Sequence, residues 1–264
     1  MSHIKSILNE LFTLQRADPP SNKEKVDAGA LEHHAIELHA QGKFDEAIDA
    51  CIHALRLNPG ESSIAGNLAY TLVCAARVDE GMMVVEKSLQ IDPRDPVALV
   101  AKGRCLMELG RYDEAAFIYD AASSLDPRNG LLQLNKGICL VYLNKDVEAL
   151  PCLEDAVKLF PGKTEAWSKK GECLRRMGNY AQALPDFDKA LQLDSSGAEA
   201  WYGKGFCEEA LGKAAEAIVS YKRFGEIAPP HMAEQQFMAR QKVLELGGLA
   251  AGTVLIYRRT VVTL

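Results

Sequence analysis

The chain has 264 residues, of which 48 % are hydrophobic and 25 % are charged, and this balance is ordinary for a soluble globular protein. Its formal net charge of −6 argues against non-specific binding to nucleic acid or to acidic membranes. Seven cysteines in a chain of this length do not indicate a small disulfide scaffold, and they favour a reducing compartment.

The first residues carry no pattern of a targeting sequence. Asn9 and Glu10 interrupt the apolar run there, so a signal-peptide core is lacking. No stretch of the sequence reaches the roughly 18 apolar residues that a membrane helix needs. We therefore expect a soluble, cytoplasmic protein without a transmembrane segment.

An amphipathic helix is predicted near the N-terminus. Five aliphatic residues share one face of a helix over residues 4–15, namely Ile4, Ile7, Leu8, Leu11 and Leu14. The stretch Asp18–Asn22 contains two prolines and is typical of a linker. We assign residues 1–27 to this helix and linker.

Most of the chain is a 34-residue repeat. Prolines expected at helix ends recur in this register, with Ser195 in place of one, at Pro59, Pro93, Pro127, Pro161 and Pro229. Small residues keep the same interval, which predicts six repeats without insertion. The array spans residues 28–231, and the repeats are 28–61, 62–95, 96–129, 130–163, 164–197 and 198–231.

Each repeat predicts two helices joined by a tight turn, and the third repeat is the clearest. Asp95 before Pro96 supplies a capping side chain and a proline at the first helical position. Gly110 can adopt positive φ and is the expected turn. A second helix should begin at Asp113–Glu114, where carboxylates meet the positive end of the helix dipole. Such a pair buries only part of its apolar surface alone and needs neighbours.

Two segments follow the array. Residues 232–247 are the predicted capping helix, with Phe237, Val243 and Leu244 on the inner face, because a repeat array needs a cap over its last open face. Residues 248–264 form an apolar, β-branched tail with two arginines in its middle.

The repeated positions resemble those of the tetratricopeptide repeat family. The fifth repeat follows the family pattern of large apolar and small residues at Trp167, Gly171, Leu174, Ala183, Phe187 and Ala190. The sixth repeat departs from the pattern at Glu208 and Phe224. The resemblance covers residues 28–231 and implies an all-α fold, a right-handed α-solenoid of antiparallel helix pairs with a C-terminal capping helix.

No pattern predicts an enzyme, a cofactor or a metal site. Four cysteines recur every 34 residues, at Cys105, Cys139, Cys173 and Cys207. Equivalent residues in adjacent repeats should lie about 8–10 Å apart or more, which is too far for a disulfide or for one zinc ion. We predict that these cysteines pack in the core. The histidines of the first repeat lack the i, i+4 spacing of a zinc pair.

Lysines form a second ladder, each just before a small residue, at Lys102, Lys136, Lys170 and Lys204. A basic strip that binds phosphates is one interpretation. We favour the other, in which the methylene stems pack and the ammonium groups reach water.

The resemblance also implies where a partner binds, since the first helices of tetratricopeptide repeats line a concave groove. Inward positions of the third repeat are Val97, Val100, Arg104 and Met107. Those of the fourth repeat are Leu131, Leu134, Ile138 and Val141, with Tyr142 adjacent. The repeat core does not require these apolar side chains, so they predict an uncovered apolar strip and an interaction site. In the alternative, the strip packs against another part of the same chain.

The last two repeats are more polar on the same face. Their predicted groove residues are Glu172, Arg175, Tyr202 and Phe206. The family's clamp for the C-terminal carboxylates of chaperones is predicted to be absent, because Asn67 matches it but Glu32 and Val97 occupy two of its basic positions.

We therefore predict a non-enzymatic scaffold or adaptor that binds a protein or peptide partner, such as an amphipathic helix, in the concave groove. Two alternatives stay open. The N-terminal helix or the C-terminal tail could occupy the groove of its own molecule or of a neighbour, giving an autoinhibited protein or a homo-oligomer. The chain could also be an accessory subunit of an enzyme complex, with the chemistry on another chain.

Overall fold

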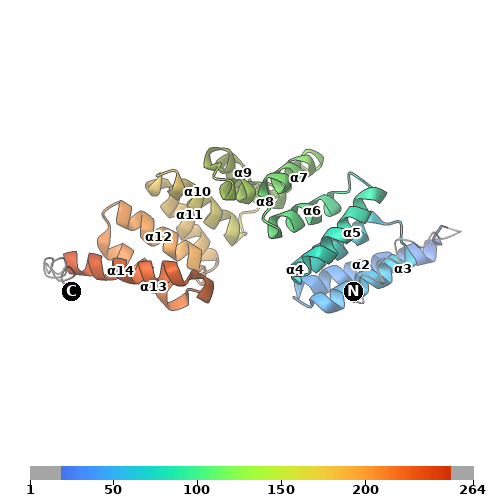
Figure 1. The fold of residues 1–264 in the computed structure, drawn as a ribbon, viewed down its shortest axis with the longest axis horizontal. Coiled ribbons are helices and arrows are strands. Elements are labelled where there is room, and N and C mark those ends of the chain that lie inside the picture. The colour runs from blue at the N-terminus through green and yellow to red at the C-terminus, as the bar shows by residue number, and fades with distance from the viewer. Residues whose placement is uncertain (1–18, 251–264) are drawn as a thin grey trace, which may run out of the picture. The chain divides into compact units, whose positions relative to one another are not determined.

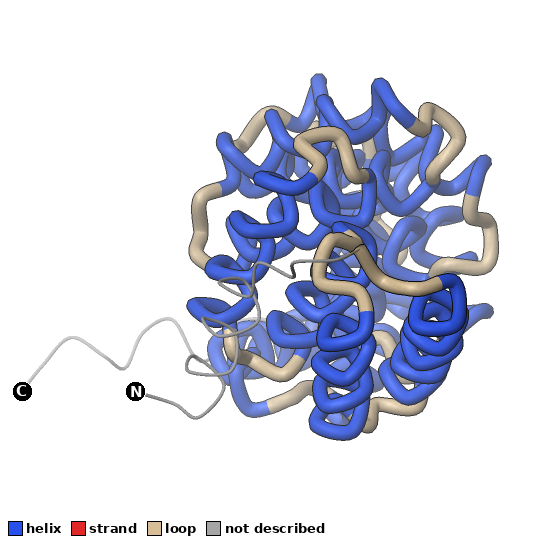
Figure 2. Tube along the Cα trace, turned by 90° about the vertical axis from the view of Figure 1, so that its right-hand side faces the viewer, coloured by secondary structure: helices blue, strands red, loops and turns tan. Residues whose placement is uncertain are grey.

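The computed structural model describes residues 19–250, with side-chain detail to residue 247. Within these residues the regular structure is entirely helical, and short loops join the helices (Figure 2). The chain divides into two compact halves, residues 1–143 and 144–264. The boundary falls between the two predicted helices of the fourth repeat. The predicted helix over residues 4–15 and most of the C-terminal tail lie outside the described residues.

The N-terminal half contains seven described helices, labelled in Figure 1. They are α2 (Asn22–Ala40), α3 (Phe44–Leu57), α4 (Ser62–Cys74), α5 (Val78–Ile91), α6 (Pro96–Glu108), α7 (Tyr112–Leu125) and α8 (Gly130–Tyr142). Each helix packs against the next in sequence, and α4 also packs against α6. These are the helix pairs that the repeat predicts.

The C-terminal half repeats this arrangement. Its elements are α9 (Asp146–Leu159), α10 (Thr164–Arg176), α11 (Tyr180–Leu193), α12 (Ala198–Ala210), α13 (Ala214–Ile227), the 3₁₀ turn η1 (Pro230–Met232) and α14 (Ala233–Ala250). Consecutive α-helices pack against one another, and α10 also packs against α12. The predicted capping helix is therefore α14, which packs against α13.

The helix starts follow local sequence signals. The Asp95 side chain accepts hydrogen bonds from the backbone N–H groups of Val97 and Ala98, with Pro96 at the first position of α6, as predicted. Ser21 and Glu24 form a reciprocal capping box at the start of α2. Because of this cap, α2 begins at Asn22, six residues before the predicted start of the array at residue 28.

The turns inside the repeats share one backbone conformation. Four of them place glycine at a positive φ, at Gly42, Gly110, Gly178 and Gly212. Asn144 and Ala76 hold the equivalent positions in the other two repeats, with φ of 58° and 59°. The turn geometry thus persists at Ala76, where the side chain resists it.

Small residues allow neighbouring helices to approach closely. A Cβ atom added to Gly103 on α6 would lie 2.5 Å from Cζ of Tyr119 on α7. A Cβ atom added to Gly203 on α12 would lie 2.4 Å from Cζ of Phe187 on α11. Each glycine therefore admits a buried aromatic ring from the adjacent helix.

The four repeat-spaced cysteines are buried and unpaired, as predicted.

Three of the four repeat-spaced lysines contact a carboxylate in addition to water. They form ion pairs with an aspartate on an adjacent helix, namely Lys136 with Asp120, Lys170 with Asp186, and Lys204 with Asp188. A packed lysine stem can bring its ammonium group to a carboxylate on the next helix as readily as to solvent.

The inner face of α14 also differs from its prediction. Phe237 and Leu244 are 62 % and 69 % exposed, so they point away from the core. The buried contacts come instead from Ala239 and Leu246, with Val243 partly buried against them. Side-chain spacing alone did not fix the helix rotation, because polar contacts also orient it. Gln236 Nε2 donates to the Gly225 carbonyl at 2.8 Å, and Lys242 Nζ donates to Glu209 Oε1 at 2.7 Å.

Candidate functional site

The predicted groove residues of the third repeat lie along one side of α6. Val97, Val100, Arg104 and Met107 are all partly exposed. Val100 and Met107 also contact the core cluster formed by α6, α7 and α8. We call these four residues the α6 face. It combines three aliphatic or thioether side chains with one guanidinium, and the structure leaves all four accessible.

The helix beside the α6 face is α4, which approaches closely. A Cβ atom added to Gly66 would lie 2.9 Å from the backbone nitrogen of Ala98. Further along α4, Ser63 Oγ and Asn67 Nδ2 donate to Glu32 Oε1 on α2, at 3.0 and 2.8 Å. The carboxylate of Glu32 is thus held by two neutral donors from the neighbouring helix.

A histidine joins the same two helices. His39 Nδ1 and Thr71 Oγ1 are 3.1 Å apart, and the His39 ring lies 5.3 Å from the rings of both Phe44 and Tyr70. Burial lowers the pKa of His39, because it disfavours the charged imidazolium. His39 therefore packs between α2, α3 and α4 and shares a hydrogen bond with Thr71.

The predicted strip on α8 is largely covered. Leu134, Ile138 and Val141 are buried, with exposures of 0, 4 and 7 %. The prediction of an uncovered strip is wrong for these three side chains. Leu131 is partly exposed. Tyr142 is 54 % exposed and stacks on Tyr112 of α7, with ring centroids 4.5 Å apart.

Three of the four predicted site residues of the C-terminal half lie together on α10 and α12, namely Glu172, Arg175 and Phe206. Glu172 accepts two hydrogen bonds of 2.7 Å from Arg175 Nε and Nη2. The Arg175 guanidinium lies 4.6 Å from the centre of the Phe206 ring, and Tyr180 packs against the same ring. Two nitrogens and one face of the Arg175 guanidinium are therefore already engaged by its own helix and its aromatic neighbour.

Tyr202 belongs to a second aromatic group nearby on α12 and α13. Its ring lies 6.0 Å from Tyr221 and 5.1 Å from Phe224. Tyr221 donates its hydroxyl to Glu209 Oε2 at 2.8 Å, and the same carboxylate accepts the bond from Lys242 on α14. These side chains tie α12, α13 and α14 together, so they serve packing.

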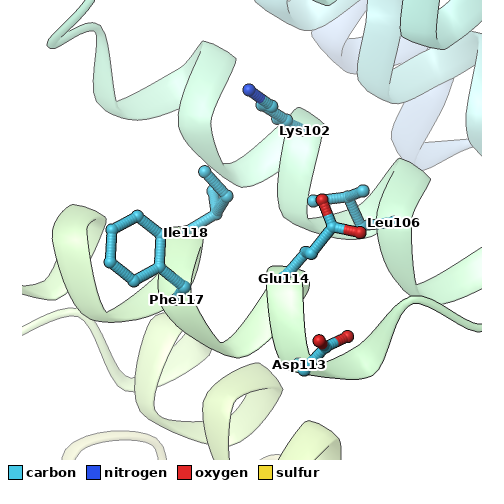
Figure 3. A pocket seen from close by; sticks show the side chains of 6 residues that line it. All are labelled: Lys102, Leu106, Asp113, Glu114, Phe117 and Ile118. Carbon is cyan, nitrogen blue, oxygen red and sulfur yellow. The ribbon is translucent and has the colours of Figure 1, made fainter.

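Sequence reasoning did not find a hollow between α6 and α7, shown in Figure 3. Its volume is about 410 Å³, and it is lined by Lys102, Leu106, Asp113, Glu114, Phe117 and Ile118. Phe117 is 74 % exposed. Arg111 holds Glu114 through two bonds of 2.6 Å. The only sequence signal was a phenylalanine on the outer side of the second helix.

The described residues show no metal-binding group and no reactive thiol among the buried cysteines. In residues 19–250 no group of three His, Cys, Asp or Glu side chains is placed to hold a metal ion. Burial raises the pKa of five thiols to about 12, at Cys51, Cys105, Cys139, Cys173 and Cys207. Such thiols are poor nucleophiles, since the thiolate is the reactive form. None of the described helices has both the length and the apolarity to cross a membrane.

The described helices, in pairs that pack on their neighbours with a 34-residue period, define a helical repeat protein. Family models described as "Tetratricopeptide repeat" match residues 75–136, 164–196 and 199–231. The chain is a tetratricopeptide repeat protein. No curated protein matches it.

Solved structures agree with this assignment. YrrB, described as "a TPR protein with an unusual peptide-binding site", is 26 % identical, with a TM-score of 0.59 over 74 % of this chain and 99 % of its own. PilF of Pseudomonas aeruginosa is 18 % identical, with a TM-score of 0.71 over 83 % of this chain and 100 % of its own. The Cut9–Hcn1 structure is 16 % identical, with a TM-score of 0.71 over 92 % of this chain and 45 % of its own. The last two show similarity of fold alone.

Proposed function

We propose that this protein is a non-enzymatic scaffold that binds a peptide or an amphipathic helix on the α6 face. The observation that carries the proposal is the partial exposure of Val97, Val100 and Met107 around Arg104. Neighbouring apolar side chains that stay partly accessible along one side of a helix are typical of a surface that binds a partner. The peptide-binding site described for YrrB supports the same mode of action. A cytoplasmic setting fits the absence of a disulfide among the cysteines of the described residues.

The α6 face sets an upper limit on affinity. Burying three apolar side chains contributes about 1.5–3 kcal/mol each, and the entropic cost of association removes much of this. A net free energy of about −4 to −6 kcal/mol corresponds to a dissociation constant between about 1 mM and about 40 µM. Reversible binding of this strength suits an adaptor.

The test uses random peptides displayed on phage as C-terminal fusions, selected against the full-length protein. Binding of a selected synthetic peptide is then measured by fluorescence anisotropy. Val100→Glu and Met107→Glu should each weaken binding about tenfold or more, because a carboxylate replaces an apolar contact. Both side chains are partly exposed, so circular dichroism should show that the variants still fold.

Phe117→Glu on α7 is the matched control, since Phe117 is the exposed apolar side chain beside the hollow of Figure 3. It should leave the affinity unchanged. If Phe117→Glu abolishes binding while the α6 variants retain it, the peptide occupies the outer side of the repeat and the proposed site is wrong.

A second candidate is self-assembly or autoinhibition through the chain's own termini. The sequence places five aliphatic residues on one face over residues 4–15. On α2, the helix that follows, Val26 and Ile36 are 71 % and 47 % exposed. Deleting residues 1–18 keeps the Ser21 cap of α2 intact. Under this candidate the deletion changes the mass seen by light scattering or raises the affinity for the selected peptide, and no change in either excludes it.

A further inference from the structure

Arg104, like Arg223 with Glu226, is held by a glutamate through one nitrogen, whereas Arg175 and Arg111 are held through two. Arg175 engages Glu172 through both Nε and Nη2, and Arg111 engages Glu114 through the same two atoms. Arg104 instead reaches Glu108 through Nη2 alone, at 2.9 Å from Oε1. Its Nε is buried and has no hydrogen-bond partner. Two arginines are thus bound side-on by a carboxylate, and Arg104 is not.

The pair with Glu108 is also easy to exchange. An arginine that precedes a glutamate by four residues is the less favourable order of charges along a helix. The side chains of Arg104 and Glu108 are 36 % and 41 % exposed, so water competes for both. A ligand carboxylate can therefore replace Glu108 without opening the core.

The surroundings leave Arg104 as an isolated cation in an apolar setting. The groups that act on it electrostatically are Glu108, Tyr70, Cys74 and Tyr119. The latter three are neutral at pH 7. Glu32 on α2 is already held by Ser63 and Asn67. Glu108 alone balances the guanidinium, and Val100 and Met107 flank it along α6.

We propose that Arg104 binds a carboxylate of the peptide that occupies the α6 face. This inference rests on the proposed function. On binding, the guanidinium turns from Glu108 toward the ligand and presents Nε and Nη2 together, which is the geometry that carboxylates prefer. The unpartnered Nε gains an acceptor in that arrangement. Apolar ligand side chains then cover Val100 and Met107, while the carboxylate fixes the register of the peptide along the helix.

The ligand carboxylate has two possible sources, an acidic side chain or the peptide C-terminus. A peptide selected as described above is synthesised in three forms. The first is the original acid, the second carries a C-terminal amide, and the third has each Asp and Glu replaced by Asn and Gln. The wild-type protein should bind one of the two altered forms about 10- to 100-fold more weakly than the original. The form that loses affinity identifies the source.

Variants of this protein then assign the effect to Arg104. Arg104→Met keeps the apolar stem and should bind all three forms alike. Arg104→Lys keeps the charge but cannot donate two parallel hydrogen bonds to one carboxylate. It should therefore retain only part of the affinity difference between the original and the altered peptide. Glu108→Gln removes the internal competitor and should tighten binding of the acid form several-fold, most clearly at low salt.

Equal binding of the three peptide forms by the wild-type protein overturns the inference, as does discrimination that persists in Arg104→Met. If Val100→Glu abolishes binding but Arg104→Met still distinguishes the three peptide forms, the peptide binds on the α6 face and Arg104 does not bind its carboxylate. If no peptide is selected, or only Phe117→Glu weakens binding, both proposals fall.

Discussion

Glu208 is a single carboxylate at a position where leucine is otherwise the rule. The equivalent residues of the other five repeats are Leu38, Leu72, Leu106, Leu140 and Leu174, and all five are buried. Glu208 is only 5 % exposed. It accepts a hydrogen bond of 2.6 Å from Ser220 Oγ and pairs with Lys204 at 3.8 Å. Burial raises its pKa, although the bond from Ser220 and the charge of Lys204 both act against the shift.

We expect Glu208→Leu combined with Ser220→Ala to stabilise the protein at pH 7 by about 1–3 kcal/mol, because well-packed apolar residues often improve on a buried ionic pair. The second change prevents an unpaired hydroxyl, and alanine is the residue that the first repeat carries at that position, Ala50. Urea unfolding followed by circular dichroism gives the free energy. A loss of stability would mean that the polar contacts contribute more than the apolar packing gained.

The same variant should alter the pH dependence of stability. The pKa of Glu208 is raised in the folded state, so the folded protein binds this proton more tightly than the unfolded chain. Its contribution to stability is therefore complete below the unfolded pKa and is lost as the pH rises through the folded pKa. Between about pH 4 and pH 7 the fall in unfolding free energy should be smaller in the double variant than in the wild type. Asp186, whose pKa burial also raises, preserves part of the slope.

The close contact between Gly103 and the Tyr119 ring leads to a second prediction for a single residue. Gly103→Ala places a methyl group 2.5–2.9 Å from three atoms of the Tyr119 ring, which is buried. We expect a loss of about 1–3 kcal/mol from overpacking. Gly29→Ala on α2 is the matched control, since no atom lies within 4 Å of its added Cβ. The control should gain about 0.5–1 kcal/mol from helix propensity.

At the scale of the helix pair, the turn at Ala76 is the strained element. Its φ of 59° costs a residue with a Cβ about 1–2 kcal/mol. Ala76→Gly relieves this strain but increases the entropy of the unfolded chain, so we expect a net gain of about 0.5–1 kcal/mol. Ala75→Gly, one residue earlier at a φ of −82°, should instead destabilise. Equal effects of the two changes in thermal unfolding would show that backbone strain plays no part.

Helix positions could be predicted from the sequence because the same boundary signals recur in six repeats. Asp95, Pro96 and Gly110 gave the start of α6 and its turn, and the structure confirms each. The start of α2 was missed because the capping box at Ser21 lies before the first repeat. A repeat pattern reports what its copies share, and this cap has no second copy.

Exposure was less predictable than position. The sequence placed Leu134 and Ile138 on the first helix of the fourth repeat, but their burial depends on tertiary packing. The pairing of the lysine ladder likewise depends on aspartates at other repeat positions, such as Asp120 and Asp186. Arg104 was predicted as a groove residue, whereas its unpartnered Nε depends on a side-chain rotamer that no pattern encodes.

At the scale of the molecule, the division into two halves predicts unequal unfolding. Both tryptophans, Trp167 and Trp201, lie in the C-terminal half, and their indole nitrogens donate to the carbonyls of Pro161 and Ser195. Stability in a repeat array is largely a sum of local terms. In Gly103→Ala, we expect far-UV circular dichroism to show a transition at lower urea while the tryptophan transition keeps its midpoint. Coincident transitions would mean that the array unfolds as one cooperative unit.

Because five thiols are buried, two native cysteines remain for labelling with thiol-reactive probes. Cys74 at the end of α4 and Cys152 on α9 are the two partly exposed cysteines among seven, and one lies in each half. The pKa of about 12 at the other five makes them slow to react with maleimides. Burial also raises the pKa of Cys74, so brief treatment of the unmodified protein should label Cys152 first and Cys74 more slowly. Once both are labelled, the distance between the two labels can be recorded with and without a bound peptide, and no engineered cysteine is needed.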